Sequence, residues 1–173
     1  MNSGLKSISE IRPHLFLAGY GCITASALKQ YGITNAVDAT NLNSKPISGL
    51  EKIEVPVEDT IIQKISNYFE TVVQYVDEVK AKGGKTVIYC GAGVSRSATL
   101  TIMYLVISEN LPLDQAYYTV NQARRIISPN VGFWRQMIDY EKQKSGGTST
   151  VELITGRMAR PIPSVYLHRS IPA

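Results

Sequence analysis

The pattern in this sequence most suited to chemistry is a cysteine followed closely by an arginine and a serine. Cys90 ends the apolar run 86–89, and Arg96 and Ser97 follow after a short loop that contains two glycines. A strand that leads through such a loop into a helix forms an anion site, because the loop N–H groups and the helix dipole point to one place. The predicted phosphate-binding residues are Gly91, Ala92, Gly93, Val94, Ser95 and Arg96.

Three side chains of this stretch suit separate tasks in phosphate-ester hydrolysis. Cys90 is the predicted nucleophile, since the field of the loop favours the reactive thiolate. Arg96 offers a planar fork of N–H donors to two phosphate oxygens and to the charge of the transition state. Ser97 is expected to donate its hydroxyl to the sulfur when the thiolate leaves. Gly91 and Gly93 are expected to permit the turns of the loop.

A phosphate ester also needs a proton for its leaving oxygen, so a carboxylic acid must reach over the loop. Asp59 is the candidate, because it follows the apolar run 53–57 and should lie on a surface loop after a strand. Glu58 is the neighbouring alternative.

The elements that must position these residues alternate between strands and helices. Short apolar runs bounded by Gly, Pro or Asn predict strands at 15–18, 33–39, 53–57 and 86–89. Helical spacing predicts helices at 25–31, with Thr24 as its cap, and over 65–79. This alternation predicts an α/β fold with a central twisted, mostly parallel sheet, flanking helices and a phosphate-binding loop between a strand and a helix.

After Cys90 the pattern becomes helical, with helices expected at 95–109, 113–125 and 131–144. We expect one catalytic domain over residues 1–144. Residues 145–173 read as a C-terminal tail that is partly ordered on the domain, through the apolar residues Val151, Leu153, Ile154, Val165 and Leu167.

Composition narrows the function classes. The chain has 173 residues, 44% of them hydrophobic, which suits a single globular unit. Only Cys22 and Cys90 occur, too few for a disulfide framework or a zinc cluster, so an intracellular, cytoplasmic protein is expected, with the nucleus or an organelle as open alternatives. No apolar stretch is long enough to span a membrane, and a net charge of +4 is too small to predict a nucleic-acid partner.

Several stretches together resemble the atypical dual-specificity phosphatases of the cysteine-dependent protein tyrosine phosphatase superfamily. These are Cys90 with Arg96 and Ser97, Gly-Val-Ser-Arg-Ser-Ala-Thr at 93–99, Val-Pro-Val-Glu-Asp at 55–59, and 123–134, which runs from Ala-Arg-Arg to Pro-Asn-Val-Gly-Phe-Trp. The likeness covers about residues 8–144.

The resemblance implies that Cys90, Arg96, Asp59 and Ser97 are nucleophile, clamp, general acid and leaving-group donor. It also implies dual specificity, with phosphotyrosine and phosphoserine or phosphothreonine in proteins, signalling kinases among them, as substrates. It implies no metal and no cofactor. The oligomeric state is left open.

The sequence departs from the family at Tyr89, where histidine is usual, and we expect this to lower activity. A phosphoprotein-binding pseudophosphatase is therefore the alternative function, although both Cys90 and Arg96 are retained. A phosphoinositide or RNA phosphatase ranks lower, because residues 91–95 carry no positive charge.

Other single residues have two interpretations each. Arg124 and Arg125 form either a basic rim for phosphopeptides or a solvated helix end. Asn130 is expected to cap the last helix rather than to serve the site. Trp134 is expected to pack in the core, and Cys22 to be a small apolar residue rather than a redox partner of Cys90.

Overall fold

The computed structural model describes residues 7–156 and 160–168. Its centre is a five-stranded sheet of order β1-β2-β5-β3-β4, in which β1 is antiparallel to β2 and the other neighbours are parallel. The strands are β1 (Ser9–Arg12), β2 (Leu15–Gly19), β3 (Asn35–Asp38), β4 (Glu51–Glu54) and β5 (Thr86–Cys90). The predicted mostly parallel α/β sheet is confirmed.

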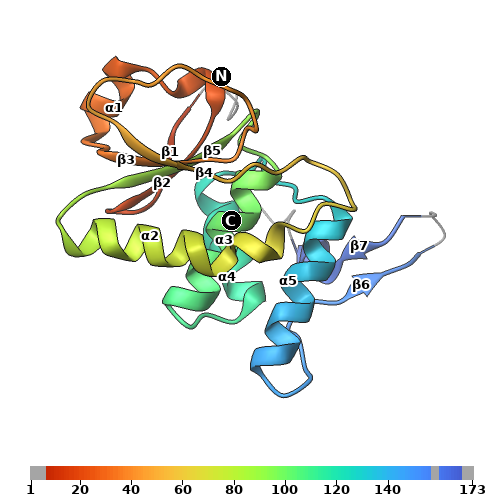
Figure 1. Cartoon of the computed structure of the whole chain (residues 1–173). Helices are drawn as coiled ribbons and strands as arrows, with labels where there is room; N and C mark the ends of the chain where they lie inside the picture. Colours follow the sequence, from red (N-terminus) through yellow and green to blue (C-terminus); the bar gives the residue numbers. More distant parts are fainter. Residues whose placement is uncertain (1–6, 157–159, 169–173) are drawn as a thin grey trace.

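Helices cover both faces of this sheet (Figure 1). One face carries α1 (Ala25–Tyr31) after the short 3-10 turn η2 (Tyr20–Cys22). The other carries a helical layer that consists of α2 (Phe69–Ala81), α3 (Arg96–Ser108), α4 (Leu113–Ala123) and α5 (Val131–Lys144). Because side chains alternate along a strand, Tyr89 joins the apolar core beneath α1, whereas Cys90 joins the core of the helical layer.

Local sequence explains where the helices begin and end. Thr24 caps α1 by accepting a hydrogen bond from the N–H of Ala27, and Gly32 ends it in the left-handed conformation. The helix predicted from residue 65 begins instead at Phe69, because Ile65–Tyr68 form the 3-10 turn η3.

Two strands differ from the prediction. The edge strand β1 was not predicted, because Ile11 is its one buried residue and it shows no apolar run. The ladder of β4 ends at Glu54 rather than at Val57, since Pro56 cannot donate a ladder hydrogen bond. Val55 and Val57 are nevertheless buried and continue towards the loop that contains Asp59.

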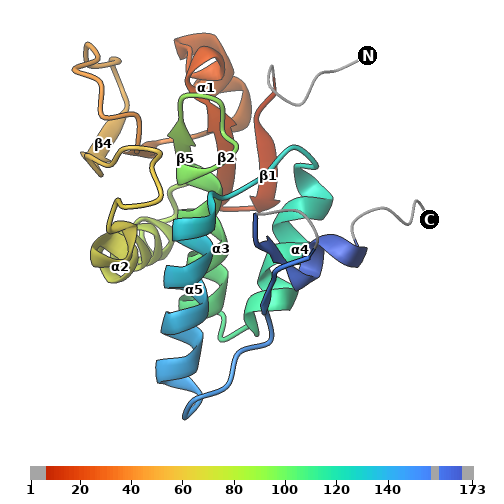
Figure 2. The same cartoon turned by 90° about the vertical axis from the view of Figure 1, so that its right-hand side faces the viewer.

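The segment after α5 packs on the helical layer. It contains β6 (Leu153–Ile154), β7 (Ile162–Pro163) and the 3-10 helix η4 (Ser164–His168), which lies beside α4 (Figure 2). Val151 and Val165 are buried, and the indole N–H of the buried Trp134 donates to the Tyr166 hydroxyl at 3.1 Å. The expectation that Leu167 docks is wrong, because this side chain is 58% exposed. The domain boundary at residue 144 stays a prediction.

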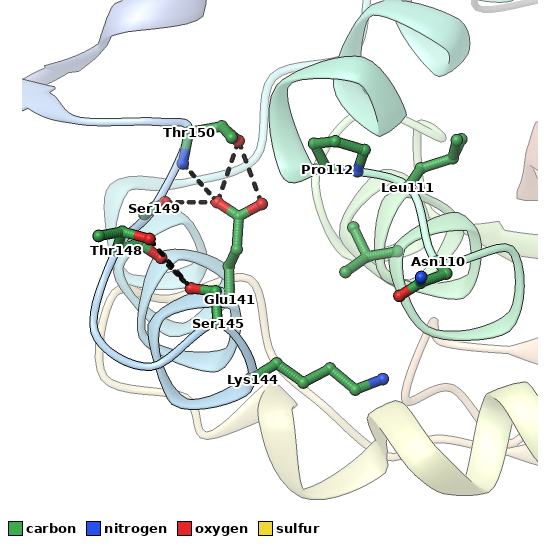
Figure 3. A pocket seen from close by; sticks show the side chains of 10 residues that line it. Asn110, Leu111, Pro112, Glu141, Lys144, Ser145, Thr148, Ser149 and Thr150 are labelled. Atoms are coloured by element: carbon green, nitrogen blue, oxygen red, sulfur yellow. Dashed lines mark hydrogen bonds between the residues drawn. The ribbon is translucent and has the colours of Figure 1, made fainter.

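Glu141 of α5 joins this segment to the helices (Figure 3). Its carboxylate accepts hydrogen bonds from the N–H of Leu113 at the start of α4, and from Ser149 and Thr150 after α5. Burial acts to raise the pKa of Glu141, but these hydrogen bonds outweigh it and the pKa is lowered. Glu141 therefore ties α4, α5 and the C-terminal segment together as a carboxylate.

Candidate active site

Cys90 is the last residue of β5, and its side chain is buried. Its strand lies between the parallel strands β2 and β3, at the carboxyl edge of the sheet, where α/β folds commonly bind ligands. The Cys90 sulfur lies 3.0 Å from the hydroxyl oxygen of Ser97, the second residue of α3. The structure thus brings together the predicted nucleophile and the predicted leaving-group donor.

The loop 91–95 is bonded to the surrounding protein through its carbonyl groups. The carbonyls of Gly91, Ala92, Gly93, Val94 and Ser95 accept hydrogen bonds, in that order, from Tyr20 N–H, Arg124 Nη2, Arg124 Nε, Ser128 N–H and Thr99 N–H. Within residues 7–156 and 160–168, no N–H group of 91–95 donates to another protein group. The carbonyls are thereby held away from the centre of the loop, and the N–H groups are available to an anion.

Gly93 is the glycine that this loop conformation requires. Its φ is +67°, and a Cβ there would lie 2.6 Å from the carbonyl carbon of Ala18. Gly91, by contrast, is not required by this conformation. Its φ is not in the left-handed region, and a Cβ there would make only an ordinary contact with Arg96.

Arg124 holds the loop from outside, and both sequence interpretations of this residue are wrong. It is 2% exposed and therefore forms neither a basic rim nor a solvated helix end. Its Nε donates to the Gly93 carbonyl at 2.9 Å, and its Nη1 donates to the Ser7 carbonyl at 2.8 Å. Burial lowers the pKa of Arg124, while the thiols of Cys22 and Cys90 act in the opposite direction. Arg124 therefore adds positive charge close to the nucleophile.

Arg96 is anchored at one of its terminal nitrogens. Nη1 donates to the carbonyls of Thr40 and Val57, at 3.0 and 3.1 Å. The first carbonyl follows β3, and the second precedes the loop that contains Asp59. Both contacts fix the guanidinium at the carboxyl edge of the sheet, and the other guanidinium nitrogens remain for phosphate oxygens.

Asp38 positions Thr40, and through it Arg96. The buried carboxylate accepts hydrogen bonds from both the N–H and the hydroxyl of Thr40, at 2.9 and 2.6 Å, and forms an ion pair with Lys52 at 3.0 Å. Burial acts to raise the pKa of Asp38, but hydrogen bonds from Thr40, Lys52 and Tyr89 outweigh it and the pKa is lowered.

Tyr89 belongs to the same network on the α1 face. Burial and the hydrogen bond to Asp38 raise the pKa of Tyr89 well above its usual value. Its hydroxyl therefore stays protonated at neutral pH. The Tyr89 side chain lies in the core beneath α1, whereas the Cys90 side chain lies in the core of the helical layer.

Asp59 is held over the loop by Asn130, which precedes α5. The Asn130 side-chain N–H₂ donates to the Asp59 carboxylate at 2.9 Å, and its backbone N–H donates to the Ser95 hydroxyl at 3.0 Å. Its Oδ1 accepts from Phe133 N–H, so the predicted cap is confirmed. Glu58 instead bonds Asn41, which makes Asp59 the better-placed acid.

The loop that contains Asp59 also packs closely on α5. A Cβ at Gly132 would collide with the backbone of Ile61, so glycine is needed for this approach. The Gln136 amide donates to the Gln63 carbonyl at 2.8 Å and accepts from Ser66 N–H at 3.0 Å. The acid loop is therefore held by the first turns of α5 as well as by hydrogen bonds within the loop, such as that from Glu58 N–H to the Gln63 side chain.

Sequence reasoning missed the positioning roles of Asp38, Thr40 and Arg124, and the second role of Asn130. The available signal was weak. Two adjacent arginines at a helix end, or an aspartate at the end of a strand, are ordinary surface patterns.

The family model described as "Dual specificity phosphatase, catalytic domain" matches residues 15–143. The chain is 43% identical over 168 residues to dual specificity protein phosphatase 14 of Bos taurus, which covers 94% of this chain and 82% of that protein. It is also 43% identical over 165 residues to the Homo sapiens protein of that name, covering 92% and 80%.

Solved structures show the same fold. The crystal structure of human DUSP28 has 28% sequence identity and a TM-score of 0.76, and covers 80% of this chain and 95% of that one. That of the human tyrosine phosphatase-like serine/threonine/tyrosine-interacting protein has 28% identity and a TM-score of 0.75, with 81% and 99% covered. With the family model spanning most of the chain, this protein belongs to the dual specificity phosphatase family of cysteine-dependent protein phosphatases.

Proposed function

We propose that Cys90, Arg96, Asp59 and Ser97 carry out the hydrolysis of phosphotyrosine and phosphoserine or phosphothreonine that characterises this family. The observation that carries the assignment is the bonding of the loop around Cys90. All five carbonyls of 91–95 are held by the surrounding protein, which leaves the N–H groups for a phosphate next to the sulfur.

In the first step the Cys90 thiolate attacks phosphorus, and the bond between phosphorus and the leaving oxygen breaks. Asp59 gives its proton to that oxygen, so the product leaves as a neutral alcohol or phenol. The loop N–H groups and Arg96 stabilise the charge on the transferring phosphoryl group. The product of this step is a cysteinyl-phosphate.

In the second step water attacks the cysteinyl-phosphate, and Asp59, now a carboxylate, takes a proton from the water. The bond between sulfur and phosphorus breaks, and inorganic phosphate leaves. Ser97, at 3.0 Å from the sulfur, donates its hydroxyl to the thiolate that is released. The chain returns to its starting state.

The test is hydrolysis of a generic aryl phosphate by the purified chain across pH. Cys90→Ser should abolish turnover. Arg96→Lys should lower kcat by at least about a hundredfold, since one positioned donor to the transition state is worth that much. Asp59→Asn should lower kcat by about 10² to 10⁴ and remove the acidic group from the pH profile.

The matched control is Arg125→Lys, the same exchange at an exposed arginine near the site. It should retain the wild-type rate. Turnover that survives in Cys90→Ser would overturn the assignment of the nucleophile, and equal losses in both lysine variants would overturn the role of Arg96.

The pseudophosphatase reading is disfavoured by the family match, and the hydrogen bonds of Arg96 to the carbonyls of Thr40 and Val57 support a positioned phosphate clamp. A covalent test separates the two functions. Rapid acid quenching during turnover should trap phosphate on Cys90 in the phosphatase, and a binding module would form no cysteinyl-phosphate.

Phosphorylated proteins are the substrate class of the family, and we keep phosphorylated signalling kinases among them as a finer proposal that rests on the family likeness. Uncharged residues at 91–95 support protein substrates over polyphosphorylated lipids or RNA. Only two cysteines occur in the sequence, too few for a disulfide framework, which supports a reducing compartment such as the cytoplasm. No helix in the described part of the chain is long and apolar enough to cross a membrane.

A further inference from the structure

A second cavity opens beside the catalytic loop. It has a volume of about 240 Å³ and lies between η2, which follows β2, and the loop that connects β3 to β4. Tyr20, Ile23, Ile47 and Leu50 supply apolar walls, and Tyr89 lies behind them. This volume suits one large side chain rather than a cofactor.

Tyr20 connects the cavity to the phosphate-binding loop. Its N–H donates to the Gly91 carbonyl at 3.1 Å, and its ring lies 6.4 Å from the ring of Tyr89. Since β2 and β3 flank β5 in the sheet, the segments that follow these strands lie on either side of the catalytic loop. The cavity therefore lies beside the phosphate-binding loop.

The charges around the cavity favour an uncharged occupant. Lys52 is neutralised, because its ammonium lies 3.0 Å from Asp38 and 3.7 Å from Glu54. Lys45 is exposed, and the Ser44 hydroxyl is bonded to Asp38 and Lys52, so the rest of the lining consists of apolar and aromatic side chains. A phosphate or carboxylate would gain little binding free energy there, whereas burial of an apolar side chain away from water is favourable.

The surface around the catalytic loop is apolar as well. Six large apolar side chains are exposed in the described part of the chain, and four of them surround the site. Tyr20 is 44% exposed, Leu42 56%, Ile61 59% and Ile62 85%. They lie on three segments: the turn after β2, the loop after β3 and the loop that contains Asp59. Such a gathering indicates a surface that contacts a partner.

We propose that this cavity is a specificity pocket that takes a bulky apolar side chain of the substrate protein, close in sequence to the phosphorylated residue. The inference rests on the proposed function and deepens it. The cavity lies beside the loop, and an extended chain advances roughly 3.3 Å per residue, so the side chain belongs close in sequence to the phosphorylated residue. The apolar rim, formed by the exposed side chains of Tyr20, Leu42, Ile61 and Ile62, contacts neighbouring residues of the same substrate segment.

The test compares pairs of phosphotyrosine peptides. The two peptides of a pair differ at one position only, which carries leucine in one and serine in the other. The varied positions are the three before and the three after the phosphotyrosine. For the wild-type chain, kcat/KM should be higher with leucine by about tenfold at one position or more. Ile47→Trp, which fills the cavity, should remove this preference. Peptide activity is expressed relative to the same variant's activity on an aryl phosphate, so damage to the catalytic loop is factored out.

The rim has a matched pair of variants. Leu42→Ser and Leu167→Ser remove the same side chain at 56% and 58% exposure, the first beside the site and the second on η4. Leu42→Ser should lower the relative activity on the leucine peptide, and Leu167→Ser should leave it at the wild-type value.

Each outcome decides the proposal. Equal rates on leucine and serine peptides, with aryl phosphate hydrolysed, would overturn the pocket and leave the proposed function intact. Absence of all turnover would overturn both. A specific activity that falls as the enzyme concentration rises, together with a dimer in sedimentation that Leu42→Ser dissociates, would instead assign the apolar surface to contact with a second copy of the chain.

Discussion

At the scale of single residues, the phosphate clamp is held by a chain of contacts that ends far from the substrate. Lys52 bonds Asp38, Asp38 bonds Thr40, and the Thr40 carbonyl bonds Arg96. Each link is fully or partly buried, so a change at one end should reach the guanidinium. The Tyr89 side chain packs in the core beneath α1.

Asp38→Asn tests this chain of contacts. The variant should lose about 2–4 kcal/mol of stability, because buried donors of Thr40 and Lys52 lose a charged acceptor. It should also lower kcat/KM on aryl phosphate, because Arg96 is displaced. Urea unfolding and steady-state kinetics measure the two effects. Glu54→Gln is the control, since it removes the exposed partner of the same lysine and should change stability by less than about 1 kcal/mol.

The stability effect should depend on pH. The pKa of Asp38 is lower in the folded protein than in the unfolded chain, so its stabilisation is complete above its usual pKa of 3.8 and is lost as the pH falls through the lower folded value. The difference between wild type and Asp38→Asn should therefore shrink below pH 4. A difference that stays constant down to pH 2 would contradict this account.

At the scale of elements, the start of α5 joins the catalytic loop to the acid loop. Asn130 caps the helix, bonds Ser95 of the catalytic loop and holds Asp59, while Gly132 admits the backbone of Ile61. Asn130 therefore has a structural role as the cap of α5 and a positioning role as the hydrogen-bond partner of Asp59.

Two substitutions at Asn130 separate these roles. Serine caps a helix about as well as asparagine, but it is too short to donate to Asp59. Asn130→Ser should keep the melting temperature and lower kcat by about tenfold or more, since misplaced groups lose rate steeply. Asn130→Ala should show the same loss of kcat and also lose about 1 kcal/mol of stability. Wild-type kcat in Asn130→Ser would refute the positioning role.

At the scale of the whole molecule, the segment after α5 is joined to the helical layer by buried valines and by Glu141. The carboxylate receives donors from α4 and from the C-terminal segment, so this segment and the helices should unfold together. Glu141 lies in the last turn of α5, and Trp134 in its first turn also bonds this segment through Tyr166.

Glu141→Gln should lower the free energy of unfolding by about 1–3 kcal/mol near pH 7, because an amide cannot accept all of these hydrogen bonds. The pKa of Glu141 is lowered by folding, so the effect should fade as the pH falls through and below its usual value of 4.5. Thermal unfolding at several pH values measures it. Glu152→Gln, at an exposed carboxylate of the same segment, should leave stability nearly unchanged.

The sequence by itself determined the parts of this protein that depend on neighbours along the chain. The apolar runs and helical spacings predicted three of the five strands closely, together with the main helices, because pleat and helix repeats are local. Cys90, the loop and Ser97 lie within one strand–loop–helix unit, so their proximity follows from local geometry. The edge strand β1 was missed because an edge position buries one side chain and shows no apolar run.

Only the tertiary structure decided which distant groups serve the site. Arg124 bonds a loop carbonyl 31 residues away, Arg96 bonds Thr40 across 56, and Asn130 reaches Asp59 across 71. The apolar pocket combines segments that follow different strands. Such contacts depend on the order of strands in the sheet and on how helices pack, and polar residues in loops carry no periodicity that reports their partners. The sequence therefore indicated the chemistry, and the packing decided what holds it in place.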